Sequence, residues 1–180
     1  RDQDTAKTSL QAALTGHLVL STFHASSAAA AVTRLLDFIG VNPLFASAIH
    51  LIMAQRLVRV LDDATKQPYQ PEPELVVQIK AVVDSLPANV KRPDLTNLTL
   101  YKPGSSSEHP FGYTGQMPLR EQMLMTPNVQ KMLRQPPNEI TMATLEKCAI
   151  DDGMITMLQY GVLKAIEGKT TLEEVYRVVG

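Results

Sequence analysis

The chain of 180 residues is 44% hydrophobic, which is enough apolar material for one large domain or for one and a half small ones. Its 17 basic and 18 acidic residues give a net charge of -1. This balance argues against nucleic acid as the main partner, because a phosphate-binding surface needs a basic excess. No apolar run reaches the roughly 18 residues that a membrane span needs, and the N-terminus lacks a signal-peptide pattern, so we expect a cytoplasmic protein.

The first forty residues predict a helix, a buried strand and a second helix. Apolar residues at helical spacing predict a helix over residues 4–14. Residues 17–23 form a nearly continuous apolar and β-branched run, which is typical of a strand buried on both faces of a parallel sheet. Ser26 or Ser27 can cap the second helix, and Gly40 supplies its stop.

Two more elements follow before the composition changes. Asn42 and Pro43 predict the start of a third helix that runs to about Ala54, because Asn caps well and Pro suits the first helical turn. Residues 56–61 alternate between charged and apolar side chains, which indicates an edge strand or a half-exposed strand.

Residues 62–110 differ in composition from the rest of the chain. Seven of the twelve prolines fall between Pro68 and Pro110, which predicts an insertion with much irregular backbone. One helix is expected within it, because apolar residues repeat at helical spacing over residues 75–86.

The last third of the chain predicts one strand and then helices. Residues 116–125 indicate a strand, and helical patterns return after Pro127. Residues 171–174 predict a capping box, in which the Thr171 hydroxyl and the Glu174 carboxylate satisfy opposite backbone donors at the start of the final helix.

Two motifs of this region resemble functional sites, but we assign neither a binding nor a catalytic role. Gly168-Lys169-Thr170 imitates the end of a phosphate-binding loop, but Leu163 stands where that loop requires glycine, so we expect a helix stop. Cys148 is solitary within a helical pattern, which predicts a small buried apolar residue rather than a nucleophile.

His24 is the best candidate for ligand contact that the pattern offers. It follows the predicted strand over residues 17–23, and open α/β sheets bind their ligands at the carboxyl ends of strands. An imidazole there can donate to a γ-phosphate oxygen, whereas His17 lies at the other end of the strand. A hydrogen-bonded structural histidine fits the same pattern, so the residues alone leave both interpretations open.

Several ordered stretches of the chain carry a resemblance to a known family. In the first 61 residues they are residues 1–5, 15–24, 33–37 and 54–59. These resemble, in order and spacing, the ATPases that drive type II secretion and type IV pilus assembly, with residues 15–24 similar to that family's histidine box. A weaker similarity follows in residues 112–116 with Glu121, in Asp152-Gly153, and in Gly168 and residues 170–175.

The resemblance implies an α/β fold in three parts. Residues 1–61 are expected to form the C-terminal part of a RecA-like parallel sheet with flanking helices. Residues 62–110 form a Pro-rich insertion in place of a zinc-binding subdomain. Residues 111–180 form a strand and a mostly helical C-terminal subdomain.

The resemblance also implies a hexameric ATP-hydrolysing motor that powers type IV pilus assembly or type II secretion. It implies catalytic roles for His24, His17 and Arg1, and cofactor-binding roles for Arg56 and Arg34. In the family, the phosphate loop and the catalytic Glu precede the position of Arg1, so we expect ATP and Mg²⁺ to act in the complete protein and this chain alone to be inactive.

The resemblance also implies two kinds of partner. One is the other copies of the chain in a homo-hexamer, and the other is an inner-membrane platform protein. The protein is therefore expected in the cytoplasm, peripherally at the inner membrane. No nucleic acid is expected.

The family commonly carries two Cys-x-x-Cys pairs that hold a structural zinc, and this chain departs from that pattern. Alignment on the neighbouring motifs puts Asp62, Thr65, Ser105 and Glu108 at the four cysteine positions. Zinc prefers thiolate and imidazole ligands, so we expect no zinc. Burial of the helix over 75–86 and of nearby apolar residues is then expected to hold the insertion together.

Other departures keep alternatives open. Residues 25–27 are Ala-Ser-Ser where the family favours more polar residues, and Gln116 stands where it usually has Arg. One alternative is a non-catalytic interaction or regulatory module that keeps the fold. Another is a nucleic-acid motor of the wider RecA-like class, which the charge balance disfavours.

Overall fold

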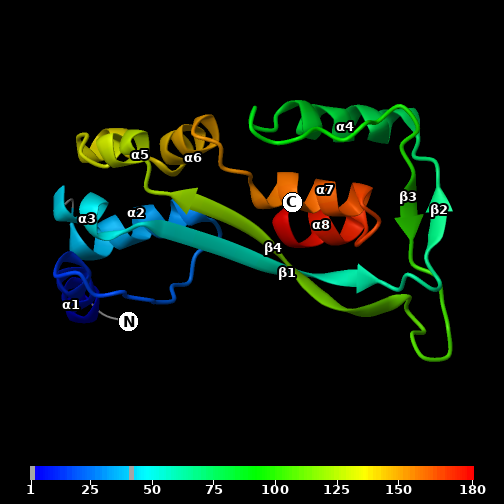
Figure 1. Ribbon diagram of the computed structural model, residues 1–180, viewed down its shortest axis with the longest axis horizontal. Helices are drawn as coiled ribbons and strands as arrows, with labels where there is room; N and C mark the ends of the chain where they lie inside the picture. Colours follow the sequence, from blue (N-terminus) through cyan, green and yellow to red (C-terminus); the bar gives the residue numbers. More distant parts are fainter. Residues whose placement is uncertain (1–2, 41–42) are drawn as a thin grey trace. The chain divides into compact units, whose positions relative to one another are not determined.

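The computed structural model describes residues 3–40 and 43–180 and divides them into two compact units (Figure 1). The first unit contains residues 1–54 and 121–154 as far as they are described, and the second contains residues 55–120 and 155–180. Among the described residues, every helix falls short of the length and apolarity that crossing a bilayer requires.

The first unit is mainly helical. Its helices are α1 (Gln3–Leu14), α2 (Ala28–Ile39), α3 (Pro43–Ala48), α5 (Pro127–Met132) and α6 (Met142–Asp151), with a 3₁₀ turn at Pro137–Glu139. Its core gathers around the alanine-rich face of α2, where Ala28 and Val32 are fully buried and pack with Met123, Val129 and Leu145. Small side chains on α2 let it approach α6 closely.

The second unit combines short strands with three helices. These are β2 (Gln67–Tyr69), α4 (Pro73–Asp84), β3 (Leu100–Lys102), α7 (Met157–Ile166) and α8 (Leu172–Val179). Strands β2 and β3 pair antiparallel, with Pro68 opposite Tyr101. The longer strands β1 (Leu51–Leu61) and β4 (Tyr113–Leu124) pair with each other, and each contributes residues to both units.

The insertion packs by burial of apolar side chains, as the sequence predicts. Ile79 and Val83 of α4 form one core with Val162 and Ala165 of α7. Leu98 and Leu100, which follow α4 in the chain, belong to the same core. The predicted helix over 75–86 is confirmed with slightly earlier bounds, and the strand predicted over 116–125 is confirmed as β4.

The strand predicted over residues 17–23 is wrong in this structure. Residues 17–25 have no regular secondary structure, and the side chains of Leu18 and Leu20 are each 87% exposed. A strand buried on both faces needs a hydrogen-bonded neighbour on each side, and the described residues place none beside this segment. The sheets of the described residues are two pairs of strands, so the RecA-like parallel sheet remains a prediction.

The third helix is shorter than predicted. It ends at Ala48 instead of continuing to Ala54, and β1 begins at Leu51. Leu51 and Met53 are exposed while Ile52 is half-buried, which is the alternation of a strand. Pairing begins at once, because the Met125 N–H donates to the His50 carbonyl at 3.0 Å. The pairing partner overrides the local helical pattern.

Threonine sets the start of each of the last four α-helices. The hydroxyl of the N-cap threonine accepts from the backbone N–H three residues later in α5, α6, α7 and α8, the caps being Thr126, Thr141, Thr156 and Thr171. Such a cap contributes roughly 1 kcal/mol to helix stability. Ser27 caps α2 in the same way, and Gly40, at φ 74°, ends it as expected.

Two interpretations made for small motifs near the C-terminus are confirmed in outline. Gly168 follows the end of α7 at φ 69°, so Gly168-Lys169-Thr170 is a helix stop. Cys148 lies half-buried on α6 against the core of the first unit, and burial raises the pKa of its thiol.

Glu174 does not complete the predicted capping box. Its carboxylate is 2% exposed and instead binds Arg177 at 2.7 Å and the Arg59 guanidinium at 2.5 Å. It also accepts the backbone N–H of Arg59, which lies on β1, at 3.1 Å. The hydrogen bonds from Arg177 and Arg59 hold the pKa of the Glu174 carboxyl far below its ordinary value of 4.5. Glu174 therefore fastens α8 to β1.

We predict that Glu174→Gln lowers the free energy of unfolding by about 1–3 kcal/mol at pH 7, because the variant loses the negative charge and one of the two acceptor oxygens that face Arg59 and Arg177. Folding lowers the pKa of the Glu174 carboxyl from its ordinary value of 4.5 in the unfolded chain. The stabilisation is therefore complete above about pH 4.5, and it is lost as the pH falls toward the pKa of the folded state. Urea denaturation across this pH range measures the difference. Glu173→Gln removes the same charge from an exposed site in the same helical turn, and an equal loss there would contradict the prediction.

Gly161 lies where α7 meets α8. A Cβ atom added there would lie 2.5 Å from Cγ1 of Val175 and 2.9 Å from Cδ1 of Leu119. We therefore predict that Gly161→Ala destabilises the protein by about 1–3 kcal/mol through overpacking, despite the better helix propensity of alanine. Gly115→Ala, where an added Cβ meets nothing within 4 Å, is the control. Thermal unfolding midpoints that rank the two variants in the opposite order would refute this explanation.

Candidate functional site

The candidate site is the segment that carries His24, between α1 and α2. His24 and residues 20–23 are exposed, and the main chain from 17 to 25 is irregular. His24 therefore presents its imidazole to solvent, where a ligand has access to it.

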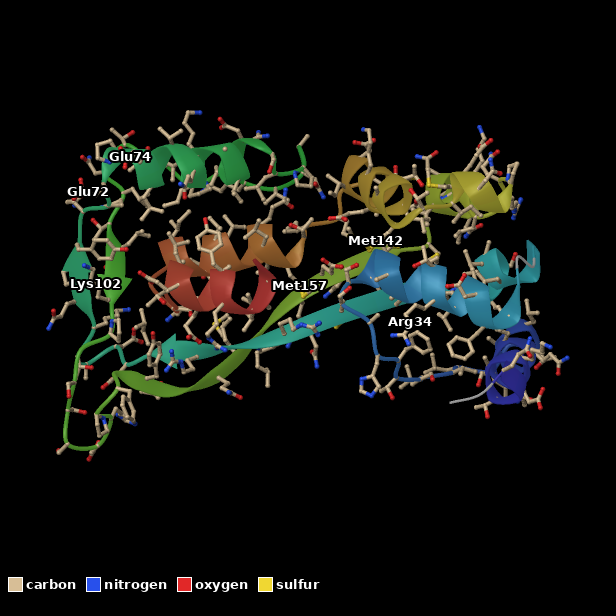
Figure 2. The ribbon with its side chains drawn as sticks, turned by 180° about the vertical axis from the view of Figure 1, so that it is seen from behind. Arg34, Glu72, Glu74, Lys102, Met142 and Met157 are labelled. Atoms are coloured by element: carbon tan, nitrogen blue, oxygen red, sulfur yellow. The ribbon has the colours of Figure 1, made fainter. Side chains whose placement is uncertain are left out.

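Arg34 of α2 holds the main chain at His24. Its Nη1 donates to the carbonyl oxygen of His24 at 2.7 Å, and its guanidinium carbon lies 5.4 Å from the centre of the Phe23 ring. The Phe23 ring in turn meets Phe38 edge to face, with centroids 5.9 Å apart and planes at 85°. Figure 2 labels Arg34 on the side of α2 that faces the preceding segment. Two residues of the segment are thus attached to the helix that follows.

The start of α2 is held by a buried carboxylate. Glu121, which is 5% exposed, accepts the backbone N–H of Ala28 at 2.6 Å. Ser27 accepts the N–H of Ala30 at 3.1 Å. The first amides of a helix have no partner within it, and a negative charge there is favourable because of the helix dipole. Glu121 therefore fixes where α2 begins, four residues after His24.

His17 belongs to a local turn instead. Its Nδ1 lies 3.1 Å from Oγ1 of Thr15 and 3.2 Å from the carbonyl oxygen of Ala12, at the end of α1. In the part of the chain that the structure describes, no hydrogen bond or ion pair joins His17 to His24. The two histidines predicted to act together are each anchored to a different helix.

The remaining predicted residues lie elsewhere. Arg1 is outside the described residues. Arg56 is an exposed residue of β1 in the second unit, with Nη1 3.4 Å from the carbonyl oxygen of Gln55. The structure therefore brings together His24 and Arg34 from the predicted set, and it adds Glu121, which the sequence shows only as part of a motif. The signal that could have found it is a glutamate that alternates with the apolar residues Leu119, Met123 and Met125 along the strand.

The four positions aligned with the family's cysteines are partly joined by hydrogen bonds. Asp62 is 7% exposed and accepts from the N–H of Ala64 at 3.0 Å and from the hydroxyl of Thr65 at 3.1 Å. Its Oδ2 lies 3.5 Å from Nδ1 of His109, and its own N–H donates to the carbonyl of Gly112 at 2.9 Å. Asp62 thus ties the end of β1 to the start of β4.

The loop that contains Ser105 and Glu108 is closed by short contacts. Ser106 accepts the N–H of His109 at 2.9 Å through its hydroxyl, and its own N–H donates to the His109 carbonyl at 3.2 Å. A Cβ added at Gly104 would lie 1.9 Å from the carbonyl oxygen of Thr65, so the two loops touch through their backbones. Among residues 3–40 and 43–180, no three His, Cys, Asp or Glu side chains are grouped so that they could hold a metal ion.

Comparison with known proteins gives the family of the chain. The family described as type II/IV secretion system protein matches residues 1–177. Type II secretion system protein E of Xanthomonas campestris pv. campestris is 38% identical over 99% of this chain, and the chain covers 30% of that protein. The type IV pilus assembly ATPase PilB of Pseudomonas aeruginosa is 35% identical over 99% of the chain and 29% of its own length. PilB of Myxococcus xanthus is 37% identical over 97% of the chain.

These matches confirm the resemblance that the motifs carry. The chain spans less than a third of the length of these relatives. The family match over residues 1–177 and identity above 35% to two of these relatives cover almost the whole chain. The chain belongs to the family of type II/IV secretion system proteins, which includes the type II secretion proteins E and the pilus assembly ATPases PilB.

Proposed function

We propose that the protein works as an ATP-hydrolysing motor that powers type IV pilus assembly or type II protein secretion. The observation that carries the proposal is the similarity of 99% of the chain to proteins named as type II secretion protein E and pilus assembly ATPase. Both names belong to one family, so the similarity does not favour either machine.

The proposed motor uses ATP and Mg²⁺ and works as a homo-hexamer. It acts on an inner-membrane platform protein, from the cytoplasm and at the periphery of that membrane. These parts of the proposal rest on the family, and the near-neutral charge of the chain agrees with the expectation that nucleic acid is not a partner.

His24 is proposed to contact the terminal phosphate of ATP. Phosphoryl transfer depends mainly on positioning and on donors that meet the charge of the transferred group, and an exposed imidazole on an anchored main chain can be such a donor. His17 and Arg1 are proposed to assist catalysis, and Arg56 to contact the nucleotide. The resemblance implies nucleotide contact for Arg34 as well, but its Nη1 donates to the His24 carbonyl oxygen, which favours a role in holding the main chain.

We predict that His24→Ala lowers the kcat of ATP hydrolysis by the full-length protein about 10–100-fold, since a hydrogen-bond donor to developing charge is lost. Steady-state kinetics with Mg-ATP measures this effect. His50→Ala, at an exposed histidine of the same unit, serves as the matched control.

Two outcomes of this experiment would contradict the proposal. If the wild-type full-length protein hydrolyses no ATP, the alternative of a non-catalytic interaction or regulatory module is favoured. If His24→Ala and His50→Ala have the same kcat, His24 has a structural role and the terminal phosphate is met by another group.

We predict that the loops around Asp62 are stable without zinc. Treatment with a chelator should leave the thermal unfolding midpoint unchanged, and metal analysis should find less than one zinc per chain. Asp62→Ala should lower the stability by about 1–3 kcal/mol, because the buried donors of Ala64 and Thr65 lose their acceptor. Asp63→Ala, at a 68% exposed carboxylate beside it, should change the unfolding midpoint much less, because solvent screens its ion pair with Lys66. Stoichiometric zinc, or a midpoint that falls with chelator, would refute the prediction.

A further inference from the structure

Glu121 and Arg34 hold the main chain of the His24 segment at two points. Arg34 binds the carbonyl oxygen of His24 itself at 2.7 Å. Glu121 binds the N–H of Ala28, four residues later, at 2.6 Å. Only the short stretch 25–27 lies between the two attachments, so the backbone at His24 has little freedom to shift away from α2.

The attachment at Glu121 is the stronger of the two. Glu121 is 5% exposed and Ala28 is fully buried, so water cannot replace this bond. Both attachments are hydrogen bonds of a charged side chain to the backbone, so burial separates them, because it increases the cost of breaking the bond at Glu121. Glu121 lies on β4, so a residue 93 positions away from Ala28 decides where α2 starts.

The attachment at Arg34 is exposed but supported from the side. Its guanidinium lies over the Phe23 ring, and Phe23 packs edge to face on Phe38. Stacking keeps the planar guanidinium in one orientation, so that its N–H points at the His24 carbonyl. With Nη1 engaged in this way, Arg34 serves the main chain, and its position is explained without a nucleotide.

We propose that Glu121 and Arg34 are positioning residues that hold His24 in place for its contact with ATP. The proposal rests on the proposed function, in which His24 meets the terminal phosphate. It assigns to Arg34 a role different from nucleotide binding, and it gives Glu121 a role in turnover without contact to the substrate. The physical basis is that a displacement of about 1 Å of a catalytic group can cost about 100-fold in rate.

The test uses ATP hydrolysis by the full-length protein. Arg34→Gln and Glu121→Ala are expected to lower kcat about 10–100-fold and to change the KM for ATP less than about 2-fold, because both act on the placement of His24. Glu121→Gln keeps an oxygen that can accept the Ala28 N–H, so it should recover most of the kcat. Arg134→Gln and Glu139→Ala are matched controls, since both are exposed residues of the same unit, and they should behave as wild type.

Double variants show whether the two residues act through His24. His24→Ala combined with Arg34→Gln should be no slower than His24→Ala alone, and the same should hold for His24→Ala with Glu121→Ala. Arg34 is exposed, so the Arg34→Gln series remains informative if Glu121→Ala does not fold.

The possible failures can be told apart. If kcat effects multiply in the double variants, or if Arg34→Gln raises KM while kcat stays unchanged, the positioning role is refuted although the motor function stands. If Glu121→Gln is as slow as Glu121→Ala, the bond to Ala28 is not what matters and the role of Glu121 is refuted. If the wild-type protein hydrolyses no ATP, the proposed function fails and this inference fails with it.

Discussion

The hydrogen bond between the Glu121 carboxylate and the Ala28 N–H is the constraint on which the first unit depends. It fixes the start of α2, and the run of small residues that follows is buried against α6. A helix faced with alanine gains little from burying side chains, so its place must be set by other means. A buried charge bonded to the helix start supplies this, and the His24 segment takes its position from the same helix through Arg34.

Buried carboxylates have a comparable part in the second unit. The Glu174 carboxylate joins α8 to β1, and the Asp62 carboxylate closes the turn after β1 by accepting from Ala64 and Thr65. Both are surrounded by donors, which offsets the cost of removing a charge from water. Between these anchors the insertion packs α4 on α7 through aliphatic side chains. Hydrogen bonds and an apolar core thus hold residues 62–110, the region that the resemblance aligns with the family's zinc-binding subdomain.

Much of the fold follows from local sequence, because its signals act over a few residues. Ser27 and Gly40 mark the ends of α2, and the periodicity over residues 75–86 gives α4. The irregular conformation of residues 17–23 could not be predicted from the sequence. An apolar run indicates burial, but it does not show whether a neighbouring element is present to bury it. The residues after Ala48 look helical, and their pairing with β4 turns them into a strand.

The candidate site was only partly predictable for the same reason. His24 could be found because its position after an apolar run is a local signal, and the family resemblance added Arg34. The contacts that give Arg34 its orientation and Glu121 its place join residues 10 and 93 positions apart. The spacing of residues in the sequence does not show which distant residues come into contact. The attachment of His24 to α2 could therefore be seen only in the structure.

The separation between Ala28 and Glu121 also bears on the order in which the chain folds. A contact that closes a loop of this size pays the entropy of the whole intervening chain, whereas the threonine caps of α5 to α8 close over three residues. We therefore expect the C-terminal helices to form early and α2 to dock late, after β4 is in place. On this expectation, a freshly synthesised or refolding chain acquires its histidine-bearing segment in final form as one of its last steps.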